Sequence, residues 1–112
     1  MKDGQIGSGE CVAACRKFAD LPNSSQWTAG PKVTDSLNLE PGTAIATFDK
    51  NGLYPQTDAP KNSAIYMGRG AQGSIFVLDQ WNPGHPPTVR ELRPSGSFPS
   101  NNPSGYSVIY LE

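Results

Sequence analysis

Residues that carry metal and redox chemistry are scarce in this sequence, whose 112 residues include two cysteines and one histidine. A structural zinc site usually takes four Cys or His ligands, so we expect no zinc site unless carboxylates complete it. The cysteines, Cys11 and Cys15, are four residues apart. Side chains at that spacing share one face of a helix but lack the geometry of a disulfide, which we therefore do not expect.

The sequence also has neither an excess of charge of one sign nor a long apolar run. Nine Lys and Arg residues stand against ten Asp and Glu, with no basic cluster, and this argues against nucleic acid as a partner. No apolar run approaches the ~18 residues of a membrane-spanning helix, so we expect no membrane partner. The polar, glycine-rich start, MKDGQIGSGE, is no signal peptide. Synthesis in the cytosol, earlier removal of a leader and export by a leaderless route stay open.

Twelve glycines and eleven prolines separate short apolar runs, a pattern typical of short strands joined by turns. Before them, Ser8 can cap a helix that runs to about Leu21, and SSQWTAG, residues 24–30, predicts a short helical turn. The predicted strands are 43–48, 63–68, 74–81, 88–93 and 106–111, with a hairpin loop after the second and a long surface loop over 94–105. The sequence therefore predicts one domain, 1–112, of the α+β class, with the helix packed on an antiparallel sheet of about five strands.

Cys11 lies in the first turn of the predicted helix, within GSGECVAAC. Unpaired N–H groups and the helix dipole lower the pKa of a thiol there, so Cys11 is a candidate nucleophile, although Glu10 beside it acts in the opposite sense. Cys15 falls in an apolar stripe with Val12 and Phe18 and is predicted to be a small core residue. A buried, unreactive Cys11 is the ordinary alternative. Amide cleavage also needs a histidine that a third polar group orients.

Five stretches, GSGECVA, PGTAIATF, AIYMG, VLDQW and NNPSGYSVI, together resemble a small bacterial family of papain-like amidohydrolase domains. That family is related to the CHAP domain (cysteine, histidine-dependent amidohydrolase/peptidase) and is similar to type VI secretion amidase effectors. The resemblance extends over nearly the whole chain. It implies a papain-like (CHAP-like) fold, hydrolysis of peptidoglycan peptide amides through a cysteine acyl-enzyme, no cofactor, action in the periplasm, and a cognate immunity protein as partner.

Carried over position by position, the resemblance places the nucleophile at Cys11, the histidine at Asn62 and the orienting third residue at Asp79. The histidine is therefore missing where the family pattern has one, and an amide does not titrate near neutral pH. Asp79 has an ordinary alternative role as a turn cap at the end of a strand. If it is the orienting residue, its carboxylate should point at residue 62.

Asn62 leaves three interpretations open. The chain is an otherwise intact amidase with an inactivating change, or a binding or decoy protein that keeps the fold, or an enzyme that uses its only histidine, His85, from the loop NPGHPP. A histidine among turn residues is more often a solvated side chain. The sequence thus predicts a crippled peptidoglycan amidase or endopeptidase, with a non-enzymatic binding module as the alternative.

Overall fold

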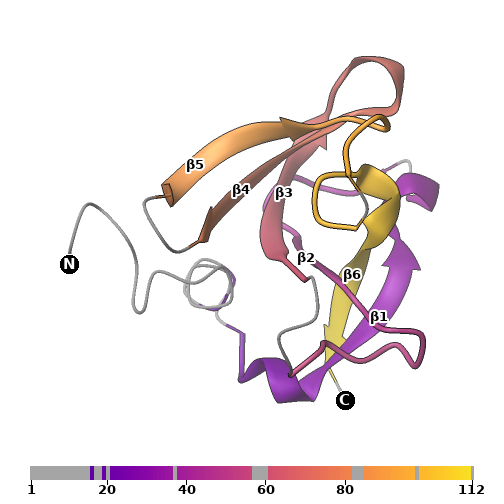
Figure 1. Ribbon diagram of the computed structural model, residues 1–112. Helices are drawn as coiled ribbons and strands as arrows, with labels where there is room; N and C mark the ends of the chain where they lie inside the picture. Colours follow the sequence, from indigo (N-terminus) through magenta and orange to yellow (C-terminus); the bar gives the residue numbers. More distant parts are fainter. Residues whose placement is uncertain are drawn as a thin grey trace.

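The computed structural model describes residues 16, 19, 21–36, 38–56, 61–81, 85–97 and 99–111. Within them the chain forms one antiparallel sheet of six strands in the order β1-β6-β2-β3-β4-β5 (Figure 1). The strands are β1 (Trp27–Lys32), β2 (Ala44–Thr47), β3 (Ser63–Arg69), β4 (Ile75–Trp81), β5 (His85–Leu92) and β6 (Tyr106–Leu111). Four short 3-10 helices join them in the described part: η1 (Ser24–Gln26), η2 (Val33–Asp35), η3 (Ala71–Gly73) and η4 (Pro103–Gly105).

The predicted fold class, an α+β papain-like fold with an N-terminal helix on about five strands, is wrong. The described residues hold six strands and no helix of seven residues or more, so this part of the chain is an antiparallel β structure. After Pro22, β-branched and aromatic residues between closely spaced glycines and prolines leave room only for short extended runs. Most of the predicted helix, 8–21, lies outside the described residues. No helix among the described residues is long and apolar enough to cross a bilayer.

The five predicted strands are confirmed, and the sixth, β1, was missed. The segment 24–30 is helical only as far as Gln26, and from Trp27 the chain is extended and pairs with β6. Gly30 suggested a helix stop, but here the Tyr110 ring lies so close that a Cβ on Gly30 would come within 2.7 Å of it. Pro31 is tolerated because it lies on an edge strand, at the irregularity where the register of β1 with β6 shifts between Ala29 and Lys32.

Side chains alternate between the two faces of the sheet, and each face carries an apolar cluster. The central strand β2 is buried along its whole length because both of its faces are covered. The first cluster consists of Val33, Ile45, Ala64, Tyr66, Ile75, Val77, Leu92 and Tyr106. The second cluster consists of Trp27, Ala44, Ala46, Tyr54, Ile65 and Ile109, with Ala19, Leu21, Phe48 and Leu78 packed against it.

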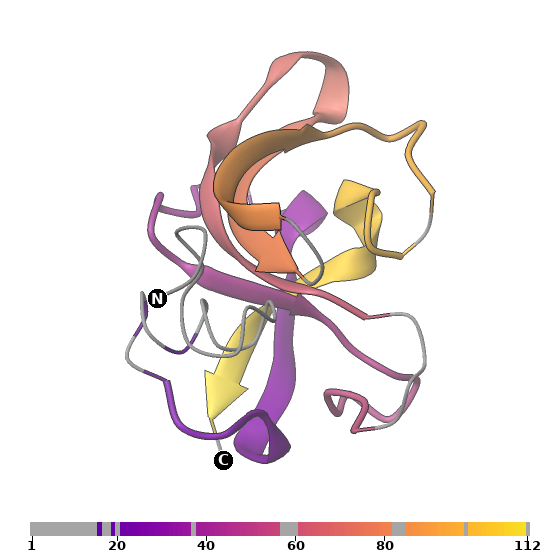
Figure 2. The same ribbon diagram turned by 60° about the vertical axis from the view of Figure 1, so that its left-hand side comes forward.

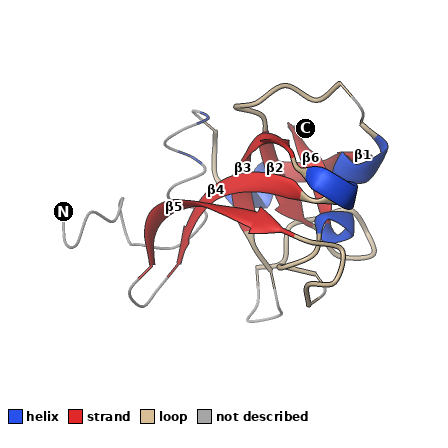
Figure 3. Ribbon diagram, turned by 90° about the horizontal axis from the view of Figure 1, so that it is seen from above, coloured by secondary structure: helices blue, strands red, loops and turns tan. Residues whose placement is uncertain are grey.

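The sheet is strongly curved, and β3, β4 and β5 bend away from β1 and β6 (Figures 1 and 2). Register shifts between Tyr66 and Gly68 in β3, and between Asp79 and Trp81 in β4, interrupt the ladders of these strands. Such bulges bend a strand and increase its twist. On the other side, η2 and η4 lie beside β6 (Figure 3).

Candidate active site

Three buried polar side chains continue the first cluster along its face of the sheet. Asn62 precedes the cluster residue Ala64 by two positions, Asp79 follows Val77 by two, and Tyr106 is itself a member of the cluster. A spacing of two residues keeps side chains on one face of a strand. The exposed fractions of Asn62, Asp79 and Tyr106 are 5%, 1% and 0%. Polar groups buried to this extent require hydrogen-bond partners.

Asn62 is held by both its side chain and its backbone. Its Nδ2 donates to Asp79 Oδ2 at 2.9 Å and to the Tyr106 hydroxyl at 2.7 Å. The amide nitrogen must face Asp79, because an ionised carboxylate only accepts hydrogen bonds. The Tyr106 hydroxyl in turn donates to the Ser100 carbonyl at 2.7 Å. The backbone N–H of Asn62 donates to Thr47 Oγ1, and that of Thr47 to the Asn62 carbonyl, each at 2.9 Å.

The carboxylate of Asp79 is fully buried and paired with Arg90 of β5. Arg90 Nη2 donates to Asp79 Oδ2 at 2.9 Å, and Nε lies 3.1 and 3.2 Å from the two carboxylate oxygens. The Arg90 side chain is 23% exposed. Its Nη1 donates to Asn101 Oδ1 at 2.7 Å. A buried carboxylate needs such a partner, since an unpaired charge in this environment is strongly destabilising.

The structure places the predicted site residues as follows. The predicted approach of the Asp79 carboxylate to residue 62 is confirmed by the 2.9 Å hydrogen bond. Cys11 lies outside the described residues. His85 begins β5, where its backbone is paired with that of Trp81. The catalytic roles assigned to these residues stay predictions.

Sequence reasoning missed Arg90 and Tyr106. The signal for Arg90 was its position two residues before the buried Leu92, which puts a cation on the core-facing side of β5. A cation at such a position calls for a buried anion nearby, and Asp79 on the neighbouring strand supplies it. Tyr106 opens the run YSVIYL, and nothing in that run showed that its hydroxyl would be used.

The site can donate hydrogen bonds but has no group at position 62 that exchanges a proton near neutral pH. A histidine there would branch at the same Cγ as asparagine, so its Nδ1 could take the place of Nδ2 and donate to Asp79. That arrangement fixes the tautomer and orientation of an imidazole in cysteine and serine hydrolases. Among the described residues, no group of three or more His, Cys, Asp or Glu is placed to hold a metal ion.

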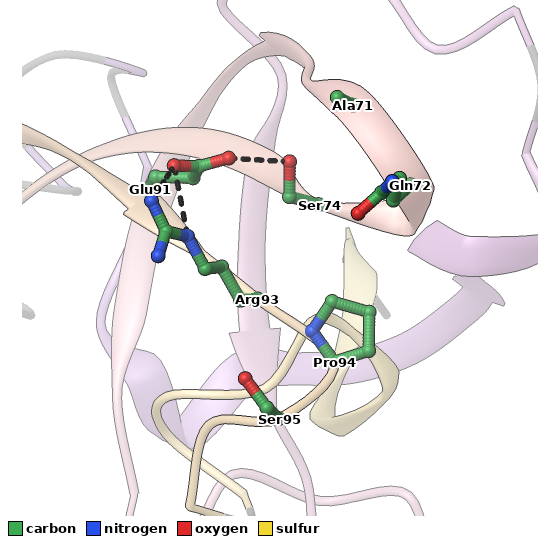
Figure 4. A pocket seen from close by; sticks show the side chains of 7 residues that line it. All are labelled: Ala71, Gln72, Ser74, Glu91, Arg93, Pro94 and Ser95. Atoms are coloured by element: carbon green, nitrogen blue, oxygen red, sulfur yellow. Dashed lines mark hydrogen bonds and ion pairs between the residues drawn. The ribbon is translucent and has the colours of Figure 1, made fainter.

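A second polar region lies at the turn between β3 and β4, where an open hollow of about 440 Å³ is found (Figure 4). Glu91 is one of its lining residues and accepts a hydrogen bond from Ser74 Oγ at 2.7 Å and two from Arg93 at 3.0 and 3.1 Å. Glu91 follows Arg90 directly, so their side chains leave opposite faces of β5. The hollow is therefore separate from the Asn62 site. It is lined by Ala71, Gln72, Ser74, Glu91, Arg93, Pro94 and Ser95.

Comparison with known families identifies the family of the chain. The model of the family Dae2, domesticated amidase effector 2, matches residues 2–109. The chain belongs to the Dae2 family. The resemblance to type VI secretion amidase effectors seen in the sequence is thereby confirmed.

Two relatives of this Dae2-family chain carry informative names. The type VI secretion amidase effector 2 protein of Salmonella typhi is 36% identical over 72 residues, which are 64% of this chain and 53% of that protein. The chain thus spans about half the length of that curated relative. The solved structure of type 6 secretion amidase effector 2 (Tae2) matches with a TM-score of 0.81 and 29% identity, covering 96% of this chain and 86% of the other. The Dae2-family chain therefore shares its overall architecture with an amidase effector.

Proposed function

We propose that this Dae2-family chain is a peptidoglycan peptide amidase or endopeptidase domain whose hydrolytic step is crippled by Asn62. The observation that carries the proposal is the buried hydrogen bond of 2.9 Å between Asn62 and Asp79. It joins the two positions that the family pattern assigns to the catalytic histidine and its orienting residue. The names of the two relatives, both amidase effectors, support amide hydrolysis as the reaction class.

In the proposed reaction the Cys11 thiolate attacks the carbonyl carbon of a peptide amide and forms a tetrahedral intermediate. Collapse to the acyl-enzyme breaks the C–N bond, and the leaving amine must take up a proton as it departs. In an active enzyme the histidine provides that proton and later activates the water that releases the acyl group. Asn62 can do neither, so the intermediate expels the thiolate and returns to the starting amide.

The remaining parts of the site are suited to a histidine. Asp79 already directs Oδ2 at residue 62, and the Tyr106 hydroxyl contacts the same Nδ2 atom at 2.7 Å. An imidazole at position 62 whose Nδ1–H donates to Asp79 would direct Nε2 away from the carboxylate, as a general base requires. We therefore propose that one substitution restores the catalytic group without rebuilding its surroundings.

The experiment compares the unmodified chain with Asn62→His on purified peptidoglycan, with release of new amino groups as the measurement. The unmodified chain should be close to background, and Asn62→His should raise turnover by ~10⁴-fold or more, because the members of a catalytic triad act as a unit. Asn62→Gln is the matched control, since it enlarges the side chain without adding a titratable group. It should be folded and stay at background.

Two further variants assign the roles. Cys11→Ala in the Asn62→His background should abolish turnover, whereas His85→Ala in that background should leave it unchanged. If the unmodified chain already digests peptidoglycan and loses this activity with His85→Ala, the assignment of the histidine to position 62 is wrong. If Asn62→His folds, binds peptidoglycan and releases no amino groups, the proposed hydrolase is rejected.

A second candidate function is binding without hydrolysis, favoured by the full use of both Nδ2 protons of Asn62 in a buried network. In that case the chain recognises peptidoglycan peptide or a protein such as the cognate immunity protein of an effector. Co-sedimentation of the unmodified chain with purified peptidoglycan tests it. Retention of the unmodified chain, together with an Asn62→His variant that gains no activity, would favour this second function. Both proposed functions include export of the chain to the periplasm.

A further inference from the structure

Arg90 holds the same Asp79 carboxylate that contacts residue 62. Its Nε and Nη2 form a fork on the carboxylate, with contacts of 2.9 to 3.2 Å, while Asn62 contacts the same Oδ2 at 2.9 Å. A two-point contact from a planar guanidinium fixes the plane of a carboxylate, whereas one contact leaves it free to rotate. Arg90 therefore helps to fix the direction in which Oδ2 faces residue 62.

Arg90 is itself anchored by the connection from β5 to β6, of which residues 93–97 and 99–105 are described. Arg90 Nη1 donates to Asn101 Oδ1 at 2.7 Å, and the Asn101 side chain and backbone donate to Ser97 Oγ and Ser97 O, each at 2.9 Å. Tyr106, the other partner of residue 62, donates to Ser100 in the same connection. Arg90, which pairs with Asp79, and Tyr106, which contacts residue 62, are thus both held by hydrogen bonds to the same loop.

We propose that Arg90 is the positioning residue of this site: it orients Asp79 toward residue 62 and, by its charge, limits how strongly that carboxylate stabilises a cation there. The inference rests on the proposed role of position 62 as the histidine position. Among the described residues, the groups that contact residue 62 are Asp79 from β4, Tyr106 from β6 and the uncharged Thr47 from β2, and Arg90 of β5 is paired with Asp79.

The charge and the geometry of Arg90 have separate consequences. An imidazolium at position 62 is favoured by Asp79 and disfavoured by the nearby guanidinium. Removal of the charge should therefore raise the pKa of a histidine at position 62. Lysine keeps the charge but offers a single ammonium in place of the planar fork, so it should leave that pKa near its parent value and still lose the orientation of Asp79.

The test uses the Asn62→His chain as parent and adds Arg90→Gln or Arg90→Lys. NMR titration gives the pKa of the new histidine, which is distinguished from His85 because the unmodified chain contains His85 alone. Arg90→Gln should raise that pKa by about 1 unit and lower kcat at least 10-fold with little change in KM. Arg90→Lys should lower kcat at least 10-fold with the parent pKa.

Arg93→Gln is the matched control. Like Arg90, Arg93 pairs with a carboxylate, but its partner is Glu91 and its side chain is 70% exposed. The control should change neither the pKa nor kcat. The proposal would be overturned if the Arg90→Gln and Arg90→Lys variants both kept the kcat of the parent and the parent pKa of the histidine at position 62. Should Arg90→Gln fail to fold, Arg90→Lys decides, since parent kcat in that variant rejects the positioning role. The NMR titration needs no turnover. An inactive Asn62→His parent would therefore reject the proposed hydrolase, and the pKa measured in Arg90→Gln would still test whether Arg90 acts on residue 62 through Asp79.

Discussion

At the scale of single residues, the site depends on hydroxyl and amide groups that satisfy one another in the interior. Asn62 gives one Nδ2 proton to a carboxylate and the other to the Tyr106 hydroxyl, which passes its own proton to the Ser100 carbonyl. The directions of donation are consistent along this chain of groups. Removal of one member therefore leaves two partners unsatisfied, and this costs more than the lost hydrogen bond itself.

Tyr106→Phe should lower the free energy of unfolding by about 1–3 kcal/mol, because it keeps the ring but removes the hydroxyl between Asn62 and Ser100. Urea denaturation is the measurement. Tyr110→Phe is the control, since Tyr110 is 53% exposed, and its effect should stay within about 0.5 kcal/mol. Equal stabilities of Tyr106→Phe and the unmodified chain would show that the buried hydroxyl contributes nothing.

At the scale of elements, the connection from β5 to β6 is a structured part of the site. The sequence predicted a long surface loop over 94–105, the loosest part of the chain. Its described residues are joined by several hydrogen bonds, among them Gly96 N–H to the Arg93 carbonyl at 2.8 Å and Asn102 Nδ2 to the Pro94 carbonyl at 2.7 Å. This packing lets the loop present Ser100 and Asn101 to Tyr106 and Arg90.

Gly96→Ala should disrupt this connection, because a Cβ at Gly96 would overlap the Asn101 carbonyl oxygen. Forced displacement of packed groups typically costs about 1–3 kcal/mol. We expect a loss of stability in that range, measured by urea denaturation, and a weaker hold of Asn101 on Arg90. Ser95→Ala, at an exposed neighbouring position, is the control and should behave as the unmodified chain. A Gly96→Ala variant as stable as this control would contradict the tight packing described for the loop.

The strands were predictable where a short run of β-branched, aromatic and other apolar residues stands between turn residues, as in SIFVLDQW, and unpredictable where tertiary packing decides. Gly30 and Pro31 gave the wrong prediction for β1 because their compatibility with a strand depends on Tyr110 and on the edge position, neither of which is local in sequence. The contact of Asp79 with residue 62 came from family resemblance. The part played by Arg90 needed the registers of β3, β4 and β5, which no single segment specifies.

At the scale of the whole molecule, Glu91 links the free energy of unfolding to pH. Hydrogen bonds from Ser74 and then from Arg93 hold the pKa of Glu91 below its ordinary value of 4.5. The unfolded chain therefore binds this proton at a higher pH than the folded chain does. The stabilisation is complete above pH 4.5 and is lost as the pH falls through the lowered pKa.

Glu91→Gln should consequently lose less stability than the unmodified chain between about pH 7 and pH 3, as measured by urea midpoints at both values. Arg93→Gln should lie between the two, because the hydrogen bond from Ser74 remains. The opposite order, with Glu91→Gln more sensitive to acid than the unmodified chain, would rule out the stabilising role of the ionised carboxylate.

The prolines of the two outer strands also bear on how separate copies of this protein meet. β1 and β5 bound the sheet on either side, β1 carries Pro31, and β5 carries Pro86 and Pro87 directly after its first residue. Outer strands with free N–H and C=O groups are templates on which another chain can add a strand, the route to edge-to-edge aggregation. Each proline removes a donor from that template. The prolines therefore oppose strand addition at the two outer strands, where the sheet could otherwise continue into a neighbouring copy.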